Sequence, residues 1–112
     1  MKRFRFVIFS LLLVAVASLQ AQAFSWGAYE GQLSWSEANA RCSSKSMRLP
    51  TRAELLNEFR LGGNRQWDQF QYGYYWSETM LQTGLPFYVH MDVGVSGLAA
   101  NGVAFVRCVS GK

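Results

Sequence analysis

The sequence predicts an α+β fold in which two short helices pack on a small antiparallel sheet and one disulfide closes the domain. Three observations predict it: two helix-capping motifs in the first half of the exported region, aromatic and β-branched residues in the second half, and Cys42 and Cys108 framing both. The chain has 112 residues, and residues 24–112 suffice for one domain with a small core.

Residues 1–23 have the order of regions found in a secretory signal peptide. Basic residues come first, an apolar stretch of about fourteen residues follows, and Ala21-Gln22-Ala23 supplies a small-x-small cleavage pattern. The apolar stretch is shorter than the roughly twenty residues that span a bilayer, so we expect cleavage before Phe24 rather than an uncleaved anchor. The protein is therefore expected to be periplasmic or extracellular, with no stable membrane anchor.

The basic character of the chain comes largely from this segment. Eleven Lys and Arg stand against seven Asp and Glu, a net charge of +4. Cleavage would remove Lys2, Arg3 and Arg5 and leave eight basic residues against seven acidic ones. Nucleic-acid binding needs a basic domain or stripe, so no nucleic-acid partner is predicted.

The two cysteines are expected to pair with each other. Exported compartments are oxidising, and two lone cysteines there normally form a structural disulfide. Neither belongs to a CxxC motif and the chain has a single His, so the alternative of a zinc site is weak. Closing a loop of about 65 residues stabilises the fold by roughly 4 kcal/mol in the chain-entropy model. No metal or cofactor is predicted.

A capping box predicts the start of the first helix. Ser34 can accept from the third helical N–H while Glu37 reaches back to the Ser34 N–H. Trp35, Ala38 and Cys42 then recur at helical spacing, so Cys42 should lie on the buried face.

A second capping box, Thr51-x-x-Glu54, predicts the second helix. Gly62-Gly63 should end it. Its apolar face is expected to comprise Leu55, Leu56 and Phe59.

The pattern after Gly63 is that of strands. Residues 74–79, 87–91 and 103–109 are rich in aromatic and β-branched side chains and are predicted as strands. In the last of them, alternation places Cys108 on the same face as Val106, toward the first helix. Residues 93–101 are predicted as either a weak strand or a loop.

Several motifs then resemble a known family. Trp35-x-Glu-Ala-x-x-x-Cys42, followed by Leu49-Pro50, resembles the opening of C-type lectin-like domains, and Phe105-Val-Arg-Cys108 resembles their closing strand. In that family the two cysteines pair. Arg48-Leu-Pro-Thr-x-x-Glu-Leu55 and Tyr75-Trp-Ser-Glu78 are similar to the bacterial type, found in collagen-like adhesins and at the lectin-like tips of intimin-type adhesins.

The calcium motifs of sugar-binding C-type lectins are missing. The sequence has neither a Glu-Pro-Asn or Gln-Pro-Asp tripeptide nor a Trp-Asn-Asp, and it lacks the second disulfide of the superfamily. The resemblance therefore implies a calcium-independent binding surface. The motifs also resemble part of formylglycine-generating enzymes, whose catalytic apparatus is too large for this chain.

The sequence offers little for catalysis. A triad needs a His, a nucleophile and an orienting acid, and the only His is His90, which alternation could place on one face with Asp92. Glu78 and Asp92 are conceivable as a carboxylate pair, but no spacing selects them. No catalytic residue is predicted.

Binding is better supported, because six aromatic residues fall between positions 67 and 76, interleaved with amides and a carboxylate. Aromatic rings stack on sugars or anchor protein contacts, although several of these rings could equally be core residues. The predicted ligand-binding residues are Arg65, Trp67, Asp68, Tyr72 and Tyr74.

A basic cluster remains after signal cleavage and could bind sulfated or carboxylated polysaccharide. The favoured interpretation is a solvated helix face with exposed ion pairs, such as Glu54 with Arg48 or Glu58 with Arg65. Its members are Arg41, Lys45, Arg48, Arg52, Arg60 and Arg65.

The predicted function is non-catalytic, calcium-independent recognition of a glycan or a cell-surface protein. The alternative is a small periplasmic protein that inhibits, protects or assembles with a specific protein partner. The fold class permits both, since function depends on surface sites rather than on architecture. The sequence does not indicate an oligomeric state.

Overall fold

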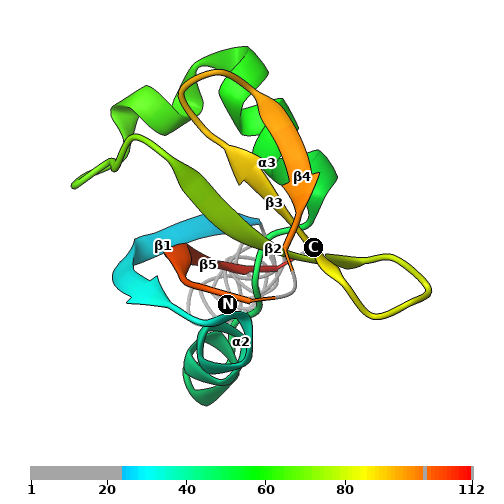
Figure 1. Cartoon of the computed structure of the whole chain (residues 1–112). Coiled ribbons are helices and arrows are strands. Elements are labelled where there is room, and N and C mark those ends of the chain that lie inside the picture. The colour runs from blue at the N-terminus through cyan, green and yellow to red at the C-terminus, as the bar shows by residue number, and fades with distance from the viewer. Residues whose placement is uncertain (1–23, 100, 112) are drawn as a thin grey trace, which may run out of the picture.

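The computed structural model describes residues 24–99 and 101–111, so the predicted signal segment lies outside the described residues. Figure 1 shows the order of the elements along the chain. None of the helices in the described ranges is long and apolar enough to span a membrane. The elements are β1 (Ser25–Leu33), α2 (Trp35–Ser44), α3 (Arg52–Leu61), the 3₁₀ helix η1 (Gly63–Gln66), β2 (Tyr74–Met80), β3 (Pro86–His90), β4 (Val95–Leu98) and β5 (Ala104–Ser110).

The five strands form one mixed sheet in the order β1-β5-β2-β3-β4. Strand β5 is antiparallel to β1 and parallel to β2, where Tyr75 pairs with Phe105, whereas β2, β3 and β4 form antiparallel pairs. The expectation of a purely antiparallel sheet is therefore wrong. The reason is that β5 returns between β1 and β2, which run in opposite directions, so it is antiparallel to one and parallel to the other.

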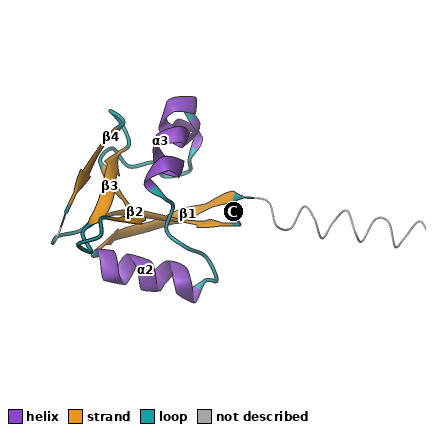
Figure 2. Ribbon diagram, turned by 90° about the vertical axis from the view of Figure 1, so that its right-hand side faces the viewer, coloured by secondary structure: helices purple, strands orange, loops and turns teal. Residues whose placement is uncertain are grey.

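The helices lie on opposite faces of this sheet, as Figure 2 shows. On one face, Ala38 and Cys42 of α2 pack with Trp76 and Cys108. On the other face, Leu55 of α3 packs with Tyr75, Val89 and Met91. Neighbouring residues on a strand point to opposite faces, so Tyr75 and Trp76 each enter a different core. The α+β class with two helices on a sheet is confirmed, with one small core on each side.

Both predicted helix starts are confirmed. Ser34 accepts from the Glu37 N–H and the Glu37 side chain accepts from the Ser34 N–H, and Thr51 and Glu54 form the same reciprocal pair. Gly62 ends α3 in the left-handed conformation, with φ of 76°, which only glycine adopts at little cost.

Strand β1 was not predicted. Its pairing with β5 has register shifts on both sides of Tyr29, so its side chains do not alternate regularly, and Gly31 has a φ of 98°. Periodicity therefore gives no strand signal in this segment. The ambiguous region 93–101 does contain a strand, β4, whose residues Val95–Leu98 pair with β3 at one edge of the sheet.

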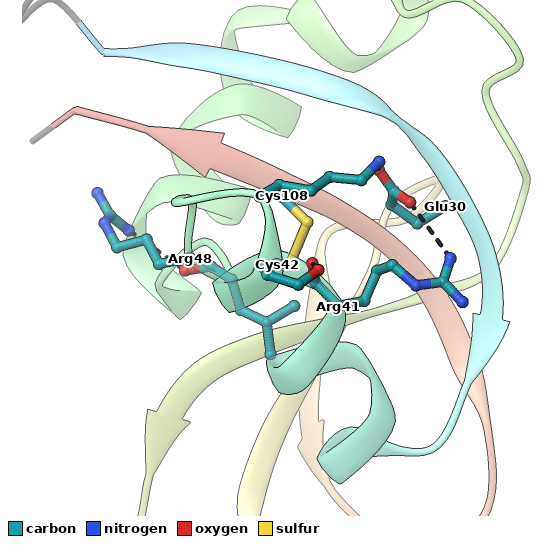
Figure 3. The surroundings of a disulfide bond; sticks show 8 residues. Glu30, Arg41, Cys42, Arg48 and Cys108 are labelled. Carbon is teal, nitrogen blue, oxygen red and sulfur yellow. Dashed lines mark hydrogen bonds and ion pairs between the residues drawn. A yellow bond between two sulfur atoms is a disulfide. The ribbon is translucent and has the colours of Figure 1, made fainter.

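The predicted disulfide is present. Cys42 of α2 and Cys108 of β5 are bonded and fully buried, with Cα atoms 5.4 Å apart. Figure 3 shows the bond and, beside it, Arg41 of α2 reaching Glu30 of β1. A disulfide is compatible with an oxidising, exported compartment. The bond joins α2 to the strand that lies between β1 and β2.

Candidate binding site

The aromatic segment 67–73 connects η1 to β2 and is fixed at several points. The Trp67 indole N–H donates to Glu58 Oε2 over 2.9 Å, and the Gln71 backbone N–H donates to the Tyr75 hydroxyl over 2.9 Å. At the end of the loop, the Met91 N–H donates to the Gly73 carbonyl over 2.8 Å. These contacts order the loop without a ligand, which lowers the entropy that binding must otherwise lose.

A buried arginine ties the same loop to the sheet. Arg107 of β5 is 3% exposed, and its guanidinium lies 4.8 Å from the centre of the Trp67 ring. One of its terminal nitrogens donates to the Gly27 carbonyl over 3.1 Å and the other donates to the Asp68 carbonyl. A guanidinium donates in a fixed planar fork, so Arg107 sets the position of the loop relative to β1.

Trp67 forms part of a packed aromatic group. Its ring centre lies 4.8 Å from that of Trp26, 5.4 Å from that of Tyr75 and 5.9 Å from that of Phe70. Burial raises the pKa of the Tyr75 phenol, which therefore stays neutral and available to the Gln71 N–H. The half-buried Trp67 therefore packs against the core on the α3 side of the sheet.

Tyr72 projects from this loop. Its side chain is 76% exposed, and its only packed aromatic neighbour in the described ranges is Phe70, with ring centres 5.0 Å apart. Beside it lies a pocket of about 480 Å³ lined by Arg65, Phe70, Tyr72 and Asp92. One pocket therefore combines a cation, a carboxylate and two aromatic rings.

The opposite wall of the pocket is also held in place. The buried Asn64 of η1 donates its side-chain N–H to the Met91 carbonyl over 2.8 Å, which joins the helix end to the turn after β3. Asp92 in that turn pairs through Oδ1 with His90 Nδ1. The His90 ring in turn packs edge-on against Tyr74, with centres 4.5 Å apart.

Comparisons with protein-family models, with curated proteins and with solved structures find no match for this chain. The C-type lectin-like resemblance therefore stays a prediction. The geometry of the pocket carries the functional argument.

The predicted ligand-binding residues have different environments. Arg65 and Tyr72 share the pocket, whereas Trp67 is packed beneath it and Asp68 contributes its backbone carbonyl to Arg107. Tyr74 is 47% exposed and packs against Tyr88 and His90, next to the pocket rather than in its lining.

Two pocket residues were not among the predicted ligand-binding residues. Phe70 belonged to the aromatic run, but nothing in the sequence separated it from its neighbours. Asp92 is twenty residues from Tyr72 and reaches the pocket only because β2 and β3 pair, with Tyr74 opposite His90. The available signal was an acidic residue directly after the predicted strand 87–91.

Half of the basic cluster forms ion pairs, namely Arg41, Lys45 and Arg48. Arg41 and Lys45 both pair with Glu30, and Arg52 lies 4.4 Å from the centre of the Phe87 ring. Among the residues that the structure describes, Arg52, Arg60 and Arg65 form no ion pair, and of these three Arg65 lines the pocket beside Tyr72.

The two expected ion pairs differ in outcome. Arg48 forms two hydrogen bonds with Glu54, at 2.8 and 2.9 Å, and lies 3.5 Å from Glu78. Glu58 instead accepts from the Trp67 indole. The Arg48 guanidinium and the Thr51 cap lower the pKa of Glu54, and Glu54 raises the pKa of Arg48.

The side-chain chemistry of the pocket is suited to binding. Glu78 lies near Pro50 at the end of β2 away from the pocket, so the conceivable pair of Glu78 and Asp92 occupies opposite ends of the β2–β3 ladder. In residues 24–99 and 101–111, no group of three or more His, Cys, Asp and Glu side chains could hold a metal ion. The pocket places the exposed Tyr72 ring next to charged groups that can form hydrogen bonds.

Proposed function

We propose that this protein is an exported, non-catalytic recognition module of the C-type lectin-like type, adhesin-like in its role, which binds a glycan without calcium. The pocket of Arg65, Phe70, Tyr72 and Asp92 is the proposed binding site. The observation that carries the proposal is the 76% exposure of Tyr72 on a loop that is otherwise fixed by hydrogen bonds. This exposed ring lies beside a cation and a carboxylate in one pocket, so it can stack on a ligand whose polar groups those charges bind.

A sugar ring suits this arrangement chemically. The apolar face of a pyranose can lie on the Tyr72 ring, while its hydroxyls can donate to the Asp92 carboxylate and accept from Arg65. A volume of about 480 Å³ falls in the range of small-molecule sites.

The first test is a glycan array probed with the oxidised protein, followed by titration of the sugars that bind. Tyr72→Ala should weaken binding by about tenfold, which corresponds to about 1.4 kcal/mol, because the stacking ring is lost. The matched control is Tyr72→Phe, which keeps the ring and should retain most of the affinity. Equal loss in both variants, or no loss in Tyr72→Ala, would contradict this site.

A protein partner is the second candidate function, and the outer edge of the sheet favours it. Strand β4 is an edge strand with no charged residue, and Val95 on it is 60% exposed. Such an edge can accept an extended segment of another chain. A stoichiometric partner that is lost with Val95→Lys, while glycan arrays stay blank, would favour this second function.

A further inference from the structure

The charges around the pocket restrict the class of glycan that it would bind. This step rests on the proposed glycan-binding function and concerns Arg65 in particular. Arg65 is exposed at the C-terminal end of η1, and in the described ranges no carboxylate lies within ion-pair distance of it. The pocket therefore contains an exposed guanidinium whose N–H groups are free to donate hydrogen bonds to a ligand.

The other charged group of the pocket, Asp92, contacts His90 rather than Arg65. Asp92 Oδ1 lies against His90 Nδ1, and the turn that carries Asp92 is held to η1 by the Asn64 hydrogen bond to Met91. Tyr74 and Met91 are the other neighbours on this side and carry no charge. A ligand can therefore approach Arg65 without competing against an existing internal ion pair.

We propose that the pocket recognises an anionic sugar residue, whose carboxylate or sulfate pairs with Arg65 while its ring stacks on Tyr72. A guanidinium binds planar carboxylates and sulfates through two parallel N–H donors. The hydroxyls of the same sugar then lie toward Asp92, which can accept from them and would repel a second anion. The arrangement selects a sugar with one acidic group at one end and hydroxyls at the other.

The test compares matched pairs of glycans with and without the acidic group. Oligogalacturonate and its methyl ester give the carboxylate pair, and keratan sulfate and its desulfated form give the sulfate pair. The wild-type protein should bind at least one acidic member about tenfold more tightly than its neutral counterpart, and this preference should weaken as salt rises.

Two variants locate the effect. Arg65→Gln should remove the preference for the acidic member, while Arg60→Gln, which changes an exposed and unpaired arginine outside the pocket lining, should retain it. Equal binding of acidic and neutral members by the wild type would overturn the inference but leave glycan recognition standing. An equal loss of the preference in both variants would also overturn the inference, because the preference would then come from the overall positive charge of the surface rather than from the pocket. Binding of no glycan at all would reject the proposed function together with this inference.

Discussion

The Glu54 side chain has two roles, because its carboxylate completes the α3 capping box and also pairs with Arg48. The cap contact needs only a hydrogen-bond acceptor, whereas the Arg48 pair needs the charge. The pair and the cap together hold the pKa of Glu54 below its ordinary value of 4.5. The two roles can be separated, since glutamine also serves at this position of a capping box.

Glu54→Gln should therefore keep the helix start and lose the ion pair. At neutral pH we expect the free energy of unfolding to fall by about 1 kcal/mol, as for a partly exposed bidentate pair. The pair stabilises the fold above pH 4.5, and that contribution disappears as the pH falls through the lowered pKa of Glu54. Urea unfolding of both proteins between pH 7 and pH 3 measures this. A constant difference over that range would contradict the assignment.

Trp67 and Tyr72 illustrate what a single sequence could and could not predict about the site. Both residues belong to the same aromatic run, and composition gives them equal claims to contact a ligand. The structure separates them because Arg107, thirty-five residues beyond Tyr72, places its guanidinium against the Trp67 ring, whereas Tyr72 packs on Phe70 and stays largely exposed. Such a long-range contact leaves no local sequence pattern.

Secondary-structure elements also differ in whether the sequence predicts them, depending on whether their defining contacts are local or distant in the chain. The starts of α2 and α3 were predictable because a capping box is a contact between residues three positions apart. The strand β1 was not, because its register shifts are set by β5 at the other end of the chain. The parallel pairing of β2 with β5 was equally unpredictable, since it depends on the position at which β5 enters the sheet.

The disulfide is the main covalent link between elements, and its loss should be measurable. Replacing both cysteines, Cys42→Ala with Cys108→Ala, should lower the free energy of unfolding by about 4 kcal/mol, because the bond closes a separation of 66 residues. Alanine avoids burying an unpaired hydroxyl at two fully buried positions. Urea unfolding gives the value, and wild-type protein treated with reductant is the control for the lost side-chain volume. An unchanged midpoint in both samples would contradict the stabilising role.

The whole molecule consists of two small cores separated by one sheet. A domain of this size has little free energy of unfolding to spare, so both cores are needed for stability. The order of the two helices and of β2, β3 and β5 was predicted, as was the cysteine pairing. The assignment of the helices to opposite faces was not, because two amphipathic helices of similar length could also pack side by side on one face.

Arg107 and Cys108 are consecutive residues of β5, yet they belong to different sides of the sheet. Cys108 secures α2, while Arg107 secures the loop of the proposed site. Mild reduction should therefore increase amide hydrogen exchange first in α2, while amides of the loop, such as that of Gln71, stay protected. Mass spectrometry of deuterium uptake would measure this, and simultaneous loss of protection in both regions would contradict it. An initial loosening of α2 on reduction would then leave the loop of the proposed site ordered, because the contacts of that loop lie on the other side of the sheet.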